Sequence, residues 1–278
     1  MIEVADALKL PLADNSVDLV FTSPPYCDAR TYGINAGRKC GEWIDWMLKV
    51  VAEAARVSKG LVLINCAGVT RDKCYWPAPE GLLYRWWESG GACWRPCYWH
   101  RYGIPGSGGK QWLRHDTEYV LAFRRDSKDL PWSDNLANGQ PCVWPVGGKM
   151  SNRTAEGRRR NGTRRAREYS QPKIANPGNL IMPGDMLHTP NGSRAGADKL
   201  AHENEAPFQL PLAEWFIRSF CPHKGIVCDP FCGSGTTAHA AIRLGRQYAM
   251  FDIRDTMVGL TKRRVAAAQA ELSPYAEI

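Results

Sequence analysis

A proline-rich turn near the start of the chain could hold a planar ring that carries an amine. The apolar run Val17–Phe21 leads into Thr22-Ser23-Pro24-Pro25-Tyr26. Two prolines fix the backbone and leave carbonyl oxygens without a strand partner, so the Ser23 side chain and the Pro24 carbonyl can accept the two amine hydrogens. Tyr26 offers a face on which such a ring can stack. This turn predicts a site that aims an exocyclic amine at an electrophile. A merely rigid loop is the alternative when the turn is taken alone.

A second turn, late in the chain, combines glycines with acidic residues. Asp229-Pro230-Phe231-Cys232-Gly233-Ser234-Gly235-Thr236-Thr237 stands between an expected strand and an expected helix. Glycines allow close approach to a ligand, and the helix start presents free amide hydrogens. Asp252 stands 19 residues after Gly233, where a carboxylate can take both hydroxyls of a ribose. The lysine of a P-loop and the third glycine of a dinucleotide turn are missing. The turn therefore favours a cationic or hydroxyl-bearing ligand, with a purely structural turn as the alternative.

Alternating strand and helix patterns must position these two turns. Apolar residues at helical spacing or in short buried runs define the elements. The expected helices are Glu42–Val57, Leu210–Phe220, Thr236–Leu244 and Asp255–Leu272. The expected strands are Val17–Phe21, Leu61–Ile64, Trp94–Tyr102, Glu118–Phe123, Gly225–Asp229 and Tyr248–Asp252. This alternation predicts an α/β fold with a mostly parallel sheet and helices on both faces, whose carboxyl edge binds ligands.

A basic segment interrupts this pattern. Residues 126–201 have little periodicity and are rich in Gly, Pro, Asn and Arg. From Lys149 to Lys173 nine basic residues stand against two acidic ones, so this stretch carries nearly all of the net charge of +8. We expect a polyanionic partner here, with a disordered, solvated charge run as the alternative.

Composition excludes several classes of protein. Of 278 residues, 44% are hydrophobic, so wholesale disorder is excluded. We find no apolar run long enough to span a membrane. We expect a protein that is not secreted and that keeps its ten cysteines reduced in the cytoplasm. The pairs Cys93/Cys97 and Cys228/Cys232 lack the further ligands of a metal site, so no metal is expected.

Together the two turns resemble the signature motifs of DNA amino-methyltransferases, which use S-adenosylmethionine and a Rossmann-like fold. The order of the turns is similar to that of the circularly permuted beta class. The resemblance covers residues 1–125 as the catalytic half of the core and 202–278 as the cofactor-binding half. It implies that 126–201 is an inserted target-recognition region. It further implies a bacterial or phage-encoded protein, double-stranded DNA as partner and a homodimer.

The resemblance also implies a set of site residues. The catalytic residues would be Ser23, Pro24, Pro25 and Tyr26. The cofactor would contact Asp6, Thr22, Ser23, Pro24, His202, Phe208, Asp229, Pro230, Phe231, Gly233, Ser234, Gly235, Thr236 and Asp252. DNA would contact Asp28, Arg30, Tyr32, Arg153, Arg158, Arg159, Arg160, Arg164, Arg165 and Arg167, most of the arginines through phosphates.

The implied reaction is direct methyl transfer to the amine of a base flipped out of the duplex. Serine at position 23 is commoner in the N4-cytosine enzymes of this family. The longer run from Ser23 to Gly33 resembles a group associated with adenine, and Asp28 could supply a nearby carboxylate. We therefore favour N6-adenine over N4-cytosine. Further alternatives are a non-catalytic DNA-binding protein and a methyltransferase acting on RNA or a protein amide.

Overall fold

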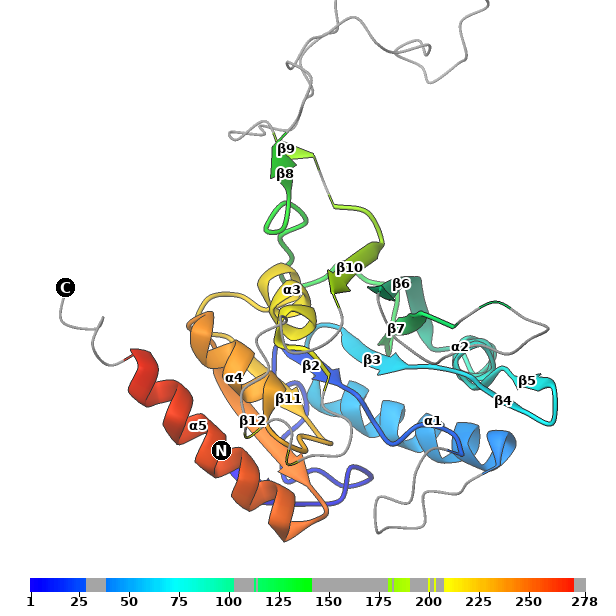
Figure 1. The fold of residues 1–278 in the computed structure, drawn as a ribbon, viewed down its shortest axis with the longest axis horizontal. Helices are drawn as coiled ribbons and strands as arrows, with labels where there is room; N and C mark the ends of the chain where they lie inside the picture. The colour runs from blue at the N-terminus through cyan, green and yellow to red at the C-terminus, as the bar shows by residue number, and fades with distance from the viewer. Residues whose placement is uncertain are drawn as a thin grey trace, which may run out of the picture. The chain divides into compact units, whose positions relative to one another are not determined.

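The computed structural model describes residues 1–28, 39–102, 113, 115–141, 180–181, 183–190, 200, 203 and 208–272 (Figure 1). The chain forms two compact units. The larger unit comprises Met1–Asp134 and Gly184–Ile278, and the smaller unit comprises Asn135–Pro183. Within the described ranges, no helix is both long and apolar enough to cross a membrane.

The larger unit is built on an eight-stranded sheet. Its strands, in spatial order, are β1 (Ile2–Val4), β12 (Gln247–Asp252), β11 (Ile226–Asp229), β2 (Leu19–Thr22), β3 (Val62–Cys66), β7 (Thr117–Arg124), β6 (Ala92–Tyr102) and β10 (Met186–Pro190). All neighbours pair in parallel except β7, which is antiparallel to both β3 and β6. The prediction of a mostly parallel sheet is confirmed.

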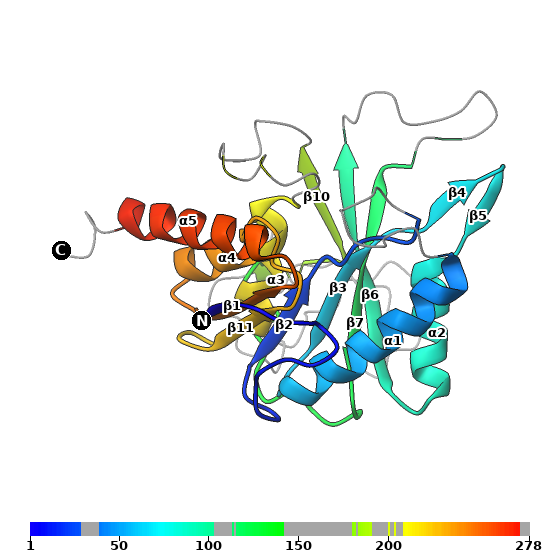
Figure 2. The ribbon, with the colours of Figure 1, turned by 90° about the horizontal axis from the view of Figure 1, so that it is seen from below.

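Helices cover both faces of this sheet (Figure 2). One face carries α1 (Cys40–Val57) and α2 (Ala78–Glu88). The other carries α3 (Leu210–Phe220), α4 (Thr236–Arg243) and α5 (Asp255–Leu272). The alternation of side chains along a strand explains this arrangement. In β2, Val20 faces the α1 side while Leu19 and Phe21 face α3.

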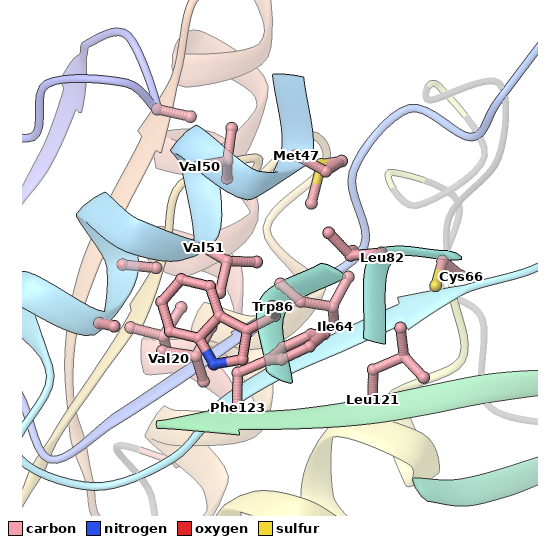
Figure 3. Close-up of a cluster of buried hydrophobic side chains, with 14 of the residues drawn as sticks. Val20, Met47, Val50, Val51, Ile64, Cys66, Leu82, Trp86, Leu121 and Phe123 are labelled. Atoms are coloured by element: carbon pink, nitrogen blue, oxygen red, sulfur yellow. The ribbon is translucent and has the colours of Figure 1, made fainter. Parts of the chain in front are cut away.

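The core beneath α1 and α2 shows why these helices dock where they do. Met47 of α1 and Trp86 of α2 meet strand residues such as Ile64 and Phe123 in one buried cluster (Figure 3). Trp86 also donates its indole hydrogen to the Arg124 carbonyl at 3.1 Å. Burying these side chains contributes roughly 25 cal/mol per Å² of apolar surface. This burial holds α1 and α2 against the strands.

Several elements were not predicted. They are β1, α2, β10, the hairpin β4 (Val69–Arg71) with β5 (Cys74–Trp76), and the pair β8 (Gln140–Pro141) and β9 (Leu180–Ile181) in the smaller unit. No regular element was predicted within residues 126–201, yet β10 lies there and extends the main sheet beside β6. Among Met186, Leu187 and His188 of this strand only Leu187 is buried, which is too little apolar pattern to recognise.

Candidate functional site

The two chemically suggestive turns leave the sheet side by side. In the parallel pair of β2 and β11, Leu19 lies opposite Val227 and Val20 lies opposite Cys228. The turn at residues 22–26 and the turn at residues 230–235 therefore begin at the same sheet edge. β12 ends at Asp252 on the other side of β11, and β1 pairs Val4 with Asp252. Asp6 follows β1, so all four segments converge at the carboxyl edge where parallel sheets bind ligands.

Asp229 joins the two turns. Thr22 Oγ1 donates to its Oδ1 at 2.5 Å, and Thr237 Oγ1 of α4 donates to its Oδ2 at 2.6 Å. The amide of Phe231 donates to Oδ1 at 3.0 Å. Burial raises the pKa of Asp229 to about 6, although these three hydrogen bonds act in the opposite direction and nearby Asp252 adds to the rise. A cation beside this carboxylate would therefore be favoured.

The glycine turn has the conformation that its sequence predicts. Gly233 and Gly235 have φ angles of 50° and 81°, values that favour glycine. A side chain at Gly235 would also meet Thr261 of α5, whose Cα lies 3.2 Å from the position of an added Cβ. The Thr261 hydroxyl donates to the Gly233 carbonyl at 2.9 Å. The turn is thus fitted to α5 by sterics as well as by hydrogen bonding.

A buried arginine supports the same turn and was not identified from the sequence. Arg264 is 2% exposed, and its Nη1 donates to Thr236 Oγ1 at 2.7 Å and to the Ser234 carbonyl at 3.2 Å. Its position on α5, far along the chain from the turn, gave no sequence signal. Ser234 and Thr236, both predicted to contact the cofactor, are buried against it.

Asp252, the acid predicted to bind a ribose, ends β12 beside the glycine turn. Its Oδ2 accepts from the Gly233 amide at 3.1 Å, and its Oδ1 accepts from the Arg254 amide at 3.0 Å and from Arg254 Nε at 3.1 Å. Next to it, Ile253 is 52% exposed and offers an apolar surface. Asp6 caps its own turn by accepting from the Leu8 amide at 2.9 Å.

The aromatic residues predicted near the cofactor flank this edge on opposite faces. Phe208 packs edge-on against Phe21 of β2, with ring centroids 5.5 Å apart. Phe231 packs edge-on against Trp46 of α1 at 5.6 Å, and Pro230 beside it is buried. The predicted cofactor residue His202 lies outside the described residues.

Ser23 and Tyr26 belong to a hydrogen-bonded network. Ser23 Oγ donates to the Tyr26 hydroxyl at 3.3 Å, and that hydroxyl donates to Glu118 Oε2 on β7 at 2.6 Å. Asn65 Nδ2 on β3 donates to the Tyr26 oxygen at 2.8 Å and to Glu118 Oε2 at 2.9 Å, while Arg101 Nη2 on β6 pairs with Glu118 Oε1 at 2.8 Å. Asn65, Glu118 and Arg101 were not predicted from the sequence. Asn65 is the one polar residue of the apolar strand β3, whereas Glu118 and Arg101 lie in strands with several polar residues and gave no signal.

The two prolines fix the rest of the turn. Pro24 is buried, and the Pro25 carbonyl accepts from Trp43 Nε1 of α1 at 2.7 Å. Asp28 was predicted to supply a carboxylate close to Ser23. In the structure Asp28 pairs with Arg71 of β4, and the carboxylate linked to Ser23 is Glu118. The predicted DNA contacts Arg30, Tyr32, Arg153, Arg158, Arg159, Arg160, Arg164, Arg165 and Arg167 lie outside the described residues.

A family model described as DNA methylase matches residues 17–263 and so spans both turns. The chain belongs to this family of N6/N4 DNA methylases. Its methyl donor is therefore the expected one, S-adenosylmethionine.

Curated relatives of this methylase are similar over nearly its whole length. The orphan methyltransferase M.BamHII of Bacillus amyloliquefaciens is 27% identical over 277 residues, which cover 93% of this chain and 92% of the relative. The DNA adenine methyltransferase YhdJ of Escherichia coli (strain K12) is 26% identical over 267 residues, covering 95% of this chain and 81% of the relative.

Solved structures share the fold of the methylase. The cytosine-N4-specific PvuII DNA methyltransferase has a TM-score of 0.67 at 18% identity, covering 95% of this chain and 89% of that one. A putative DNA modification methylase from Thermus thermophilus, solved in complex with S-adenosylmethionine, has a TM-score of 0.56 at 22% identity, covering 95% and 92%. These likenesses confirm the Rossmann-like architecture.

The residues at the sheet edge fit this cofactor by their chemistry. The glycine turn is flanked by the carboxylates Asp229 and Asp252, which are hydrogen-bond acceptors and suit a ligand with positive charge and ribose hydroxyls rather than a pyrophosphate. The apolar surface at Ile253 suits a nucleoside base. In the described part of the chain no group of three or more His, Cys, Asp or Glu could hold a metal ion.

Proposed function

We propose that this methylase transfers the methyl group of S-adenosylmethionine to the N6 amine of an adenine flipped out of double-stranded DNA. The observation that carries this proposal is the hydrogen bond between Thr22 and Asp229, which couples the amine-binding turn to the glycine turn. Family membership supports DNA as the substrate. The basic stretch from Lys149 to Lys173 supports a polyanion as partner.

Each half of the site has its own task in this proposal. Asp252 would accept hydrogen bonds from the ribose hydroxyls, and the amides of the glycine turn would approach the cofactor closely. Asp229 would provide negative charge near the cationic part. When bound, the cofactor supplies an electrophilic methyl group on a sulfonium, so alignment matters more than a strong base.

The turn at residues 22–26 would hold the base. Ser23 Oγ and the Pro24 carbonyl would accept the two hydrogens of the target amine, which turns the nitrogen lone pair toward the methyl group. Tyr26 would stack on the base. The hydrogen bond from Trp43 to the Pro25 carbonyl keeps the turn rigid, so little ordering is left to be done when the base arrives.

The target base is adenine or cytosine, and the two differ in the methylated nucleoside that they yield. The run from Ser23 to Gly33 and the adenine specificity in YhdJ's name favour N6-adenine. Serine at position 23 and the cytosine-N4 specificity in the PvuII enzyme's name make N4-cytosine the second candidate.

The test is nucleoside mass spectrometry on unmethylated genomic DNA incubated with the protein and methyl-labelled S-adenosylmethionine. We expect labelled N6-methyladenine. Labelled N4-methylcytosine would contradict the choice of base and keep the reaction class. A DNA digest without any labelled methyl nucleoside, from protein that binds the cofactor, would contradict methyl transfer to DNA. A parallel incubation with RNA and with protein substrates would then test the other acceptors.

A further inference from the structure

A continuous chain of hydrogen bonds leads from the catalytic turn into the sheet. It runs from Ser23 Oγ through the Tyr26 hydroxyl to Glu118 Oε2, with donor–acceptor distances of 3.3 and 2.6 Å. Glu118 is 5% exposed, and it lies on β7, the antiparallel strand beside β3. Burying a carboxylate costs free energy unless it is paired and hydrogen-bonded. We therefore asked which groups hold Glu118 and what its position does.

The direction of each hydrogen bond follows from counting hydrogens. The single hydrogen of the Tyr26 hydroxyl goes to Glu118, since a carboxylate can only accept. The Tyr26 oxygen must then accept, and it does so from Asn65 Nδ2 at 2.8 Å and from Ser23 Oγ at 3.3 Å. The hydrogen of Ser23 therefore points toward Tyr26. The lone pairs of Ser23 remain available to accept a hydrogen from a substrate amine.

The network keeps Tyr26 protonated and Glu118 in place. Burial, together with the charge of Glu118, raises the pKa of Tyr26 well above its ordinary value, so this residue acts as a neutral hydroxyl that donates one hydrogen while accepting others. Arg101 balances the charge of Glu118 from one side, and Asn65 donates to it from the other. Both partners lie on strands, which makes the position of the carboxylate rigid.

We propose that Glu118 is a positioning residue of the methyl transfer that acts on the substrate amine through Tyr26 and Ser23, and that it takes up the proton which the methylated nitrogen must lose. This inference rests on the proposed function of the site. It adds a role for a residue that lies 92 positions after Tyr26 and outside both sequence motifs.

The proposed step balances in atoms and electrons. The lone pair of the amine nitrogen forms the new N–C bond, and the S–C bond breaks with its electron pair left on sulfur. The nitrogen, now positively charged, gives one proton to Ser23 Oγ. Ser23 passes its own hydrogen to the Tyr26 oxygen, and Tyr26 passes its hydrogen to Glu118, which becomes a neutral carboxyl group. No residue is oxidised or reduced, and the proton later returns to solvent.

The chain offers a matched control for this network. Tyr119 donates from its hydroxyl to Glu80 Oε1 at 2.9 Å, and Tyr75 donates to the same oxygen at 2.9 Å. These tyrosine–glutamate pairs have the same chemistry as Tyr26 and Glu118, but among the described residues they make no hydrogen bond to Ser23. The variants Tyr119→Phe and Glu80→Gln thus measure what a missing tyrosine–glutamate bond costs without the link to Ser23.

The experiment measures single-turnover methyl transfer to DNA at saturating cofactor, for the wild type, Tyr26→Phe, Glu118→Gln and the double variant. We expect each single variant to be slower by on the order of a hundredfold, the range of general acid–base contributions. The dissociation constant for S-adenosylmethionine should stay within about twofold of the wild-type value, because the cofactor half is intact. The double variant should be no slower than the slower single variant, since both residues serve one relay.

Several results would overturn the proposal. One is transfer by Tyr26→Phe or by Glu118→Gln at a rate within about threefold of the wild type, as we expect of Tyr119→Phe and Glu80→Gln. Another is a double variant whose rate reduction is the product of the two single reductions, which would mean that the two residues act separately. If the wild type labels no DNA nucleoside, the proposed function is wrong. If the wild type labels DNA and the variants do so at a similar rate, the proposed function stands and only the role of Glu118 is wrong.

Discussion

The Thr22 hydroxyl donates a 2.5 Å hydrogen bond to the carboxylate of Asp229, which is 207 positions later in the sequence. Thr22 ends β2 and Asp229 ends β11, two adjacent parallel strands, so this bond ties together the turns that begin there. Both residues are fully buried. A substitution at Thr22 should therefore also alter the glycine turn, even though Thr22 belongs to the other motif.

The substitution Thr22→Val should destabilise the protein and weaken cofactor binding together. Valine keeps the shape but leaves a buried carboxylate oxygen without one of its donors, at a cost of about 1–3 kcal/mol in the free energy of unfolding. Urea unfolding and calorimetric titration with S-adenosylmethionine measure the two effects. Thr70→Val, at an exposed position of β4, serves as the control. Wild-type stability and affinity in Thr22→Val would refute the coupling between the two turns.

The pKa of Asp229, raised to about 6, predicts a dependence of stability on pH. The unfolded chain releases this proton near pH 4 and the folded protein near pH 6, so between these values the folded state binds more protons. The free energy of unfolding should therefore fall as pH rises from about 4 to about 6, by on the order of 3 kcal/mol from this group, and then level off. Asp229→Asn should remove this component, and an unchanged pH profile in that variant would contradict the assignment.

The same carboxylate predicts how cofactor affinity responds to pH. A cation near Asp229 favours its charged form, so binding lowers this pKa and releases a proton. The affinity for S-adenosylmethionine should then rise as pH increases from about 5 to about 7, and Asp229→Asn should flatten this rise. Calorimetric titration in two buffers of different ionisation enthalpy measures the released proton directly. Cofactor binding without proton release near the pKa of Asp229 would count against a role for its charge.

Gly235 should tolerate no side chain. Gly235→Ala forces a positive φ on alanine and brings its Cβ against Thr261, at a cost of about 1–3 kcal/mol. Gly259→Ala, in the open surroundings of α5, should instead stabilise the protein by about 0.5–1 kcal/mol. Thermal unfolding and cofactor titration compare the two variants. Equal behaviour of both would show that the shape of the glycine turn is not critical.

The basic stretch should control DNA affinity in a salt-dependent way. Neutralising Arg158, Arg159 and Arg160 should weaken binding and reduce the slope of log affinity against log salt by up to about 0.9 for each phosphate that is no longer neutralised. Fluorescence anisotropy at several salt concentrations measures the slope. Neutralising the exposed Lys49, Lys59 and Lys128 gives the same change in net charge elsewhere. Equal slopes for the two triple variants would mean that only net charge matters.

The parts of the candidate site that are local in the chain could be proposed from the sequence alone. The turn at residues 22–26, the glycine turn and Asp252 could be recognised because each combines unusual residues within a few positions at the end of an apolar run. The order of strand and helix patterns then predicted that they share one sheet edge. The helix Leu210–Phe220 was predicted with the bounds that the structure gives.

The sequence did not reveal the residues that act across the sheet. Glu118, Asn65 and Arg101 come together only through the pairing of β3, β7 and β6, and none of them belongs to a motif that is local in the chain. Arg264 likewise reaches the glycine turn only through the packing of α5. Such contacts depend on strand order and helix docking, which residue patterns along the chain do not encode directly. The short strands β1 and β10 were not predicted for a related reason, because neither has enough buried residues to form a recognisable apolar pattern.

The most direct test of the account compares Ser23→Ala with the wild type for two properties of one preparation. These are binding of S-adenosylmethionine by calorimetry and transfer of its labelled methyl group to DNA. We predict that the dissociation constant stays within about threefold of the wild-type value while transfer falls by at least about a hundredfold, because in the proposed function Ser23 acts on the amine in the transition state. Transfer by Ser23→Ala at the wild-type rate would contradict the claim that these two turns form one methyl-transfer site.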